Sequence, residues 1–191
     1  MNEVIELSSD DDDNSAADYR IGITDFVNVI VLGPPKSKPR PKFMSWMRGG
    51  RMFRRVVNPG AQEETTFRNA FVQSLQVLYG RVPTLPTFHA HEPVELEITF
   101  YKKLPLTFFV GDNRQSGLRN PYRLLGTRPM DVKVPDIDNL AKFVFDSLNG
   151  VLYADDSQLV KVVLLKTYHM DPPFTGKTLI KFKMSTNTLV L

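Results

Sequence analysis

Residues 135–156 read PDIDNLAKFVFDSLNGVLYADD, and their spacing predicts a helix over residues 137–149 that ends at Gly150. One face of this helix is apolar and consists of Ile137, Leu140, Ala141, Val144 and Leu148. Asp138 and Lys142, four residues apart, lie together on another face. We therefore expect the helix to pack into a core by one side and to present a charged pair on the other.

Two pairs of carboxylates flank this helix, Asp136 and Asp138 at its start and Asp155 and Asp156 after its end. Because the chain turns back at once, the second pair can return beside the first. Carboxylates placed close together repel and are costly to desolvate, and a hard cation such as Mg²⁺ removes that cost. Each residue also has a structural interpretation, since an Asp at a helix start is often a cap and Asp138 with Lys142 could be a surface ion pair. The set as a whole favours a metal site, in which spacing alone does not separate Asp155 from Asp156.

Charge is distributed unevenly along the chain. Residues 1–20 hold seven acidic residues and one arginine, so the rest of the chain carries +9 within a total of +3. A basic stretch without acidic residues contains Lys36, Lys38, Arg40, Lys42, Arg48, Arg51, Arg54 and Arg55, with Phe43, Trp46 and Phe53 among them. The alternative is a solvated basic loop. Together with a metal site, the stretch predicts a nucleic acid as partner and these eight basic residues as its contacts.

Length and composition limit the class of protein. The 191 residues suit one domain with a substantial core. The absence of cysteine excludes a disulfide framework and a Cys-based zinc site, and favours an intracellular setting. No stretch approaches the roughly 18 apolar residues that span a bilayer, so we expect no membrane association.

The folded domain is expected to follow an acidic tail. Residues 1–22 have high negative charge and little to bury, which predicts disorder, and residues 23–191 form the domain. Short apolar or alternating runs predict strands over residues 27–32, 52–57, 93–102, 158–168 and 178–184. A further helix should begin with Asn58 as N-cap and Pro59 as its first residue, and end at Gly80.

These elements predict an α/β or α+β fold, a single domain in which a mixed β-sheet is packed by two main helices. Residues 93–102 alternate apolar with polar side chains, so this strand should have one wet face. Residues 105–134 are irregular and basic, and predict a flexible loop. Loops of this length are often functional, although a tolerated insertion fits the composition equally well.

One set of residues recurs in a specific order: Asp136-Ile137-Asp138-Asn139-Leu140, Lys142, Asp146, Leu148, Asn149-Gly150, Asp155-Asp156, Gln158 and Val160. This order resembles the core of the RusA family of Holliday junction resolvases. A weaker likeness includes Gly33-Pro34, the run KPRPKF at residues 38–43 and Val57-Asn58-Pro59, and in all it spans roughly residues 26–184. The acidic tail and the long Arg-bearing loop depart from the compact bacterial pattern, which leaves junction selectivity and cleavage-sequence preference open.

The resemblance implies a RusA-like domain that acts as a homodimer and cuts four-way DNA junctions by paired symmetric nicks. It implies Mg²⁺ as cofactor, for which Mn²⁺ can substitute. Asp136, Asp138 and Asp156 match the family's essential acidic residues and Lys142 its essential lysine, while Asp155 is a further candidate ligand. Two other functions compete with this one, a nuclease for flaps or other branched DNA and a non-catalytic junction-binding scaffold. A binding protein gains little from acids near phosphates without metal, which argues against the scaffold.

The acidic tail carries a short motif of its own. Val4, Ile5 and Leu7, followed by two serines and four aspartates, resemble a SUMO-interacting motif, in which a short apolar strand pairs with a sheet edge. An acidic tail that limits non-specific nucleic-acid binding is the alternative. The motif would imply a nuclear location in a eukaryotic or nuclear-replicating viral setting, and otherwise we expect the cytoplasm.

Overall fold

The structure, a computed structural model, describes residues 25–81, 83–108, 131–170 and 175–185. The predictions for the acidic tail with Val4, Ile5 and Leu7, and for most of the 105–134 loop, lie outside these residues. Within them, no helix combines the length and apolar character needed to cross a membrane.

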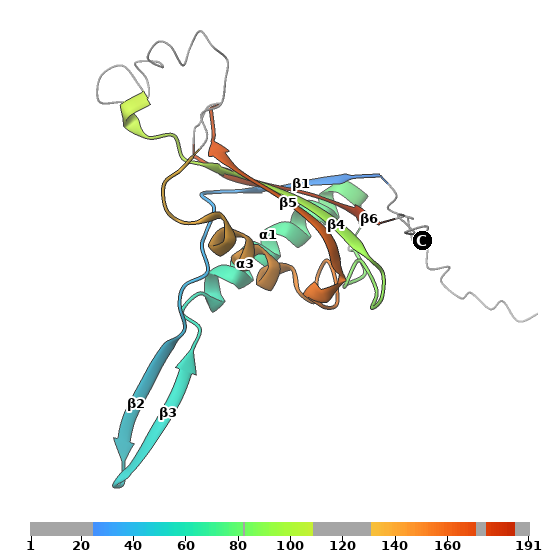
Figure 1. Cartoon of the computed structure of the whole chain (residues 1–191). Coiled ribbons are helices and arrows are strands. Elements are labelled where there is room, and N and C mark those ends of the chain that lie inside the picture. Colours follow the sequence, from blue (N-terminus) through green and yellow to red (C-terminus); the bar gives the residue numbers. More distant parts are fainter. Residues whose placement is uncertain (1–24, 82, 109–130, 171–174, 186–191) are drawn as a thin grey trace, which may run out of the picture.

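A four-stranded mixed sheet is the centre of the domain (Figure 1). Its strands are β1 (Val27–Leu32), β6 (Lys177–Met184), β4 (Val94–Lys102) and β5 (Leu159–Tyr168), in that spatial order. β6 is antiparallel to both of its neighbours, whereas β4 and β5 run parallel. The parallel pair requires a crossover connection, and the predicted helix after Asp136 lies within it.

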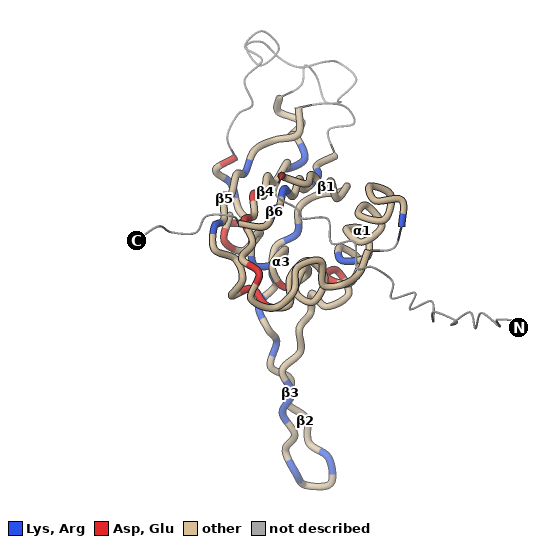
Figure 2. Tube along the Cα trace, turned by 90° about the vertical axis from the view of Figure 1, so that its right-hand side faces the viewer, with Lys and Arg blue, Asp and Glu red and all other residues tan. Residues whose placement is uncertain are grey.

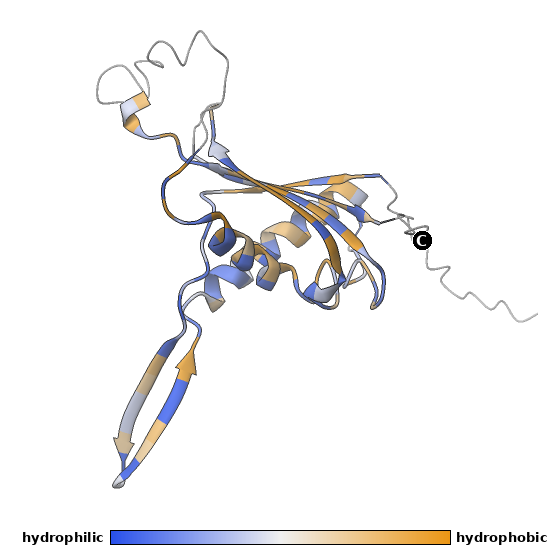
Figure 3. Cartoon of the chain, viewed as in Figure 1, coloured by the Kyte–Doolittle hydropathy of each residue, from blue (hydrophilic) through white to orange (hydrophobic). Residues whose placement is uncertain are grey.

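Two helices, α1 (Ala61–Tyr79) and α3 (Ile137–Leu148), cover one face of the sheet (Figure 1). The core between the layers is apolar and aromatic, with Phe71 and Leu75 from α1, Leu140, Phe143, Val144 and Leu148 from α3, and Leu96, Ile98, Phe100, Ile180 and Phe182 from the sheet. Hydrophobic residues follow the sheet strands in Figure 3. The predicted fold, an α+β domain with a mixed sheet and two main helices, is therefore confirmed, as is the apolar stripe of the 137–149 helix.

The basic stretch forms a hairpin that projects away from this body (Figure 1). It consists of β2 (Lys42–Arg48) and β3 (Arg51–Val57), paired in antiparallel register through Trp46 and Phe53. Gly49 and Gly50, with φ of 57° and 74°, supply the left-handed backbone that a two-residue hairpin turn requires. All of its strand residues except Val57 are exposed, so the hairpin is an arm rather than part of the core.

Two local predictions were wrong. Helix α1 begins at Ala61 behind Gly60, because the Asn58 side chain accepts a hydrogen bond from the Gly60 amide (3.0 Å) in a turn that precedes the helix. The polar face of β4 is not wet at Glu95, which is only 3% exposed. Lys161 and Lys183 approach its carboxylate to 3.4 and 3.7 Å, and these ion pairs make its burial tolerable.

Candidate active site

Asp136 occupies the N-cap position of α3 but does not cap the helix. Its backbone is extended, with φ −66° and ψ 151°, and its side chain accepts no capping hydrogen bond. The side chain is exposed and has no hydrogen bond or ion pair with the described residues. Because a carboxylate at this position usually bonds the first amides of the helix, its open state makes Asp136 available to a ligand.

Asp138 and Lys142 form an exposed pair on the outer face of α3. The Lys142 Nζ donates a hydrogen bond to Asp138 Oδ2 at 3.3 Å, and both side chains are 62% exposed. That hydrogen bond lowers the pKa of the Asp138 carboxyl, which is ionised at neutral pH as any exposed aspartate is. An exposed ion pair of this kind contributes little to stability. Asp138 or Lys142 can therefore leave the pair to bind a ligand at little cost.

The structure separates Asp155 from Asp156. Asp155 is the N-cap of the short 3₁₀ helix η3 (Asp156–Gln158), and its Oδ1 accepts a hydrogen bond from the Ser157 amide at 2.9 Å. Interactions with the Ser157 side chain and with its amide lower the pKa of the Asp155 carboxyl. Asp156 is exposed and, among the described residues, has no side-chain partner. Asp155 therefore has a capping role, which leaves Asp156 as the open carboxylate.

Gln158 fixes the position of this turn, a role that the sequence alone did not reveal. Its Oε1 accepts from the amides of Ala154 (2.8 Å) and Asp155 (3.1 Å). Its Nε2 donates to the carbonyls of His89 (2.6 Å) and Glu92 (3.0 Å). A single buried amide thus ties the acidic turn to the loop before β4. The sequence did carry one sign of this role: Gln158 lies three residues after Asp155, which is the spacing of a capping box.

A tight turn brings Asp156 back towards α3. Gly150 has φ 74°, and its amide donates to the Tyr153 carbonyl at 2.8 Å. Tyr153 is fully buried, and its hydroxyl donates to the Phe145 carbonyl of α3 at 3.1 Å. Burial raises the pKa of the Tyr153 hydroxyl, and the negative charges of Asp156 and Asp146 raise it further. The chain therefore turns back against α3 at Phe145, but within the described residues the second acidic pair does not gather with Asp136 and Asp138 into a group of three acidic side chains.

These carboxylates fit a divalent metal by chemistry, as open oxygen donors. Among the described residues, no three His, Cys, Asp or Glu side chains lie close enough together to hold a metal ion. Mg²⁺ keeps several waters, however, and commonly binds one or two carboxylates together with substrate phosphates. Asp136 and Asp156, which have no side-chain partner among the described residues, and the ionised Asp138 are donors of that kind. Their assignment as metal ligands stays a prediction.

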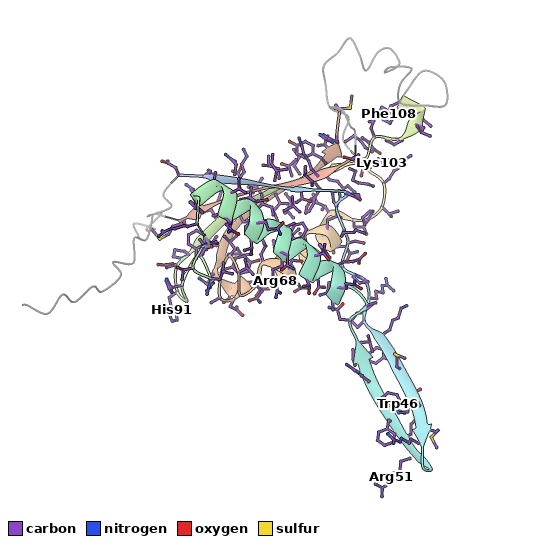
Figure 4. The ribbon with its side chains drawn as sticks, turned by 180° about the vertical axis from the view of Figure 1, so that it is seen from behind. Trp46, Arg51, Arg68, His91, Lys103 and Phe108 are labelled. Atoms are coloured by element: carbon purple, nitrogen blue, oxygen red, sulfur yellow. The ribbon has the colours of Figure 1, made fainter. Side chains whose placement is uncertain are left out.

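The hairpin has two different faces, because directly paired residues share a side. One face carries Lys42, Met44, Trp46, Arg48, Arg51, Phe53, Arg55 and Val57, and the other carries Phe43, Ser45, Met47, Met52, Arg54 and Val56. Trp46 and Phe53 stack with ring centroids 5.8 Å apart and 15° between planes. Figure 2 shows the basic residues spaced along the arm, and Figure 4 shows Trp46 on it and Arg51 at its tip. Four of the predicted nucleic-acid contacts thus share one face with the stacked aromatic pair.

Lys36 and Lys38 lie at the base of the arm and contact acidic residues. Lys36 Nζ is 3.1 Å from Glu63 in an exposed pair. Lys38 Nζ lies 2.7 Å from Glu64 of α1 and 2.5 Å from Asp146 of α3, and its amide donates to the Asn139 carbonyl at 3.0 Å. Burial alone would lower the pKa of Lys38, but its hydrogen bonds to Asp146 and Glu64 outweigh that effect and raise it. Lys38 therefore joins the base of the arm to both helices.

Comparison with known proteins shows the family of the chain. A family model described as Endodeoxyribonuclease RusA matches residues 33–175. The chain is also similar to the Bacillus subtilis protein YqaN, described as uncharacterized, with 29% identity over 148 residues that cover 78% of this chain and 92% of that protein. RusA-family proteins are endonucleases that resolve Holliday junctions, act on branched DNA and generally depend on divalent metal ions. The chain belongs to the RusA endodeoxyribonuclease family.

Proposed function

We propose that this protein is a Mg²⁺-dependent nuclease that resolves four-way DNA junctions by paired, symmetric nicks. The observation that carries the proposal is a pair of exposed carboxylates, Asp136 and Asp156, that have no partner within the part of the chain that the structure describes. They precede and follow α3, which presents Asp138 and Lys142. Asp155 and Gln158, by contrast, are engaged in holding the turn. Asp136 and Asp156 make no such hydrogen bonds with the described residues, so their carboxylates are suited to bind a ligand from outside the chain.

Asp136, Asp138 and Asp156 would hold the metal. When bound, the metal supplies a water of lowered pKa and neutralises charge that builds on the scissile phosphate. The Asp138 carboxylate is exposed and ionised at neutral pH, as aspartates ordinarily are, and is therefore available to the metal. The Asp136 side chain accepts no capping hydrogen bond from the helix amides, so its carboxylate is open to a ligand.

Lys142 acts on the phosphate rather than on the metal, because an ammonium group has no lone pair to donate. In the free protein it is paired with Asp138. With Asp138 serving as a ligand of the metal, the Lys142 ammonium would be free to donate hydrogen bonds to the phosphate oxygens. Those bonds strengthen as negative charge develops on the phosphate and on the leaving oxygen.

The hairpin arm is suited to bind the DNA backbone. A two-stranded ribbon fits a DNA groove, and cations neutralise phosphates while aromatic rings stack on unpaired bases. The arm presents Lys42, Arg48, Arg51, Arg54 and Arg55 with Trp46 and Phe53, and Arg40 is exposed just before it. We assign this surface to the arms of a branched substrate.

Neutralising Arg54 and Arg55 to glutamine should weaken junction binding and lower the slope of log affinity against log salt by about one unit for each lost phosphate contact. Lys36→Gln is the matched control, since this cation is already paired with Glu63 and should contribute less to the slope. Fluorescence anisotropy at several salt concentrations, with Ca²⁺ in place of Mg²⁺, measures both. An unchanged slope in the double variant would remove the two arginines from the DNA surface.

Two cuts in opposed strands need two active sites, so a two-fold homodimer is the proposed assembly. Sedimentation of the protein with and without junction DNA tests it, and a monomer on DNA under cleaving conditions would contradict it.

Substrate preference is tested by comparing cleavage of a mobile four-way junction, a flap and a linear duplex of the same sequence in Mg²⁺. A junction resolvase cuts the first at least about tenfold faster than the other two, which corresponds to about 1.4 kcal/mol of discrimination. Preferential cutting of the flap would assign the chain to the alternative, a nuclease for other branched DNA.

A further inference from the structure

The backbone that leads into Asp136 is held by two lysines of the sheet. Three successive carbonyls each accept a hydrogen bond from a lysine ammonium, those of Lys133 (2.7 Å from Lys166 Nζ), Val134 (2.8 Å from Lys102 Nζ) and Pro135 (2.9 Å from Lys166 Nζ). Val132 and Val134 are 93% and 79% exposed. The segment therefore turns its backbone towards the protein and two of its apolar side chains towards solvent, an inversion of the usual arrangement.

Lys166 lies in an unusual place for a lysine. It pairs in register with Phe100, so it is on the face of β5 that the helices cover, and its side chain is only 10% exposed. Lys102, two residues beyond Phe100 on β4, is on the same face, and its side chain is 20% exposed. Because burying a cation is costly without partners, these two side chains must be compensated by the groups that they contact.

Asp131 supplies part of this compensation. Its side chain is fully buried, and Lys102 Nζ approaches its Oδ2 to 2.8 Å at an angle outside that of a hydrogen bond. Its Oδ1 accepts hydrogen bonds from the Tyr168 hydroxyl (2.7 Å) and the Lys133 amide (3.1 Å). Burial alone would raise the pKa of the Asp131 carboxyl, but Lys102 and Tyr168 outweigh that effect and lower it. Asp131 is the first residue of the segment 131–135. The two lysines therefore contact the side chain at the start of this segment and the carbonyls of its last three residues.

Stability alone does not account for such a cluster. Replacing buried ion pairs by packed apolar residues is often neutral or stabilising. Directional hydrogen bonds to three consecutive carbonyls do something that apolar packing does not, since they fix the path of a segment without regular secondary structure. Asp136 follows this segment directly, and no side-chain contact with the described residues holds its carboxylate. The placement of that carboxylate therefore depends on the backbone before it.

We propose that Lys166, acting with Lys102 and Asp131, is a positioning residue that sets the place of the Asp136 carboxylate and through it the affinity of the site for divalent metal. This inference rests on the proposed function, in which Asp136 is a metal ligand. Residues that orient a metal ligand from behind typically change metal affinity by about 10–100-fold when they are replaced. Lys166 is 10% exposed and its ammonium contacts the backbone before Asp136, so its effect is expected in metal binding before it is expected in the rate at saturating metal.

Lys166→Met tests the proposal, because methionine keeps an unbranched apolar stem and removes the ammonium. Binding of Mn²⁺ to the full-length protein without DNA is measured by calorimetry, and thermal unfolding is measured in parallel. The Mn²⁺ dissociation constant is expected to rise about 10–100-fold in a folded variant. In cleavage assays, the Mg²⁺ concentration for half-maximal activity should rise similarly, with most of the maximal rate recovered at high Mg²⁺.

Lys161→Met is the matched control, since Lys161 is on the opposite face of the same strand and pairs with Glu95. It should bind Mn²⁺ as the wild type does. Lys166→Arg keeps a cationic donor and should restore part of the affinity. If Lys166→Met does not fold, Lys102→Met, which removes only the bond to the Val134 carbonyl and the contact with Asp131, is held to the same criterion.

The outcomes separate this inference from the function on which it rests. A wild-type protein that neither binds Mn²⁺ nor cuts junctions would contradict the proposed function. A wild-type protein that does both, with a folded Lys166→Met or Lys102→Met variant of unchanged Mn²⁺ affinity, would overturn the positioning role alone.

Discussion

Asp156→Asn is expected to reduce junction cleavage in Mg²⁺ by at least about 10²–10³-fold, while its melting temperature stays close to that of the wild type. The Asp156 side chain is exposed and, within the described residues, has no partner, so neutralising it removes no contact that stabilises the fold. It does remove one of three negative charges proposed to attract the metal. Single-turnover cleavage of a labelled four-way junction measures the loss, and anisotropy in Ca²⁺ should show that the variant still binds DNA.

The neighbouring Asp155 provides the matched control. Asp155→Asn makes the same change of charge one residue away, but asparagine caps a helix about as well as aspartate, so both cleavage and stability should stay near wild type. Asp155→Ala removes the cap and should lower stability by about 0.5–2 kcal/mol, read as a fall in melting temperature. Equal losses of cleavage in the two asparagine variants would show that the capping bond does not distinguish their roles.

Lys142→Met is expected to reduce cleavage by about 10²–10³-fold while metal binding is retained or tightened. The expectation follows from the 3.3 Å pair, in which the lysine ammonium competes with a metal ion for Asp138. Removing the ammonium frees that carboxylate, and the pKa of Asp138 rises back towards its usual value. Cleavage falls because the phosphate loses its cationic donor.

Calorimetry with Mn²⁺ and single-turnover cleavage, performed on the same variant, test this division of roles. Lys142→Arg, which keeps the charge but changes its shape, should retain part of the activity. Weaker Mn²⁺ binding in Lys142→Met would contradict the account, because it would place the lysine in support of the metal rather than at the phosphate.

The core of this fold was predictable because periodicity reports burial directly. Helix α3 has one apolar face, from Leu140 to Leu148, and the strand at residues 93–102 also has one apolar face. In the structure, the apolar face of each element is buried. The turn at Gly150 was also predictable, since a left-handed backbone after a helix favours glycine. These signals are local, and a local pattern is sufficient when one side of an element is much more apolar than the other.

Roles that depend on partners distant in sequence were not predictable. Lys38 reads as one more cation of a basic stretch, but its partners Glu64 and Asp146 are 26 and 108 positions away. Glu95 reads as a wet residue of an alternating strand, and only the sheet order brings Lys161 and Lys183 beside it. Spacing alone made Asp155 and Asp156 equally good candidates for the metal ligand. They differ by the hydrogen bond that the Asp155 side chain accepts from the Ser157 amide, which the spacing does not reveal.

The sequence contains a sign of the role of Lys166 in its position within the alternating pattern of β5. Lys166 follows the apolar run from Val162 to Leu165, and its alternation phase places it on the covered face with Leu164. A lysine in that phase requires a buried partner, and Asp131 is one of only two acidic residues in the 105–134 stretch. Charge at a position where the pattern calls for an apolar side chain is thus a useful sign of a positioning contact.

The most direct test of the central claim is to map the nicks on a mobile four-way junction in Mg²⁺, in Ca²⁺ and with chelator. We predict paired nicks at symmetric positions in two opposed strands in Mg²⁺, and DNA binding without nicks in Ca²⁺. Asp156→Asn in Mg²⁺ should behave as the wild type does in Ca²⁺. Cleavage by the wild type that persists in chelator, or cleavage by Asp156→Asn at the wild-type rate, would contradict a metal-dependent site built on the open carboxylates beside α3.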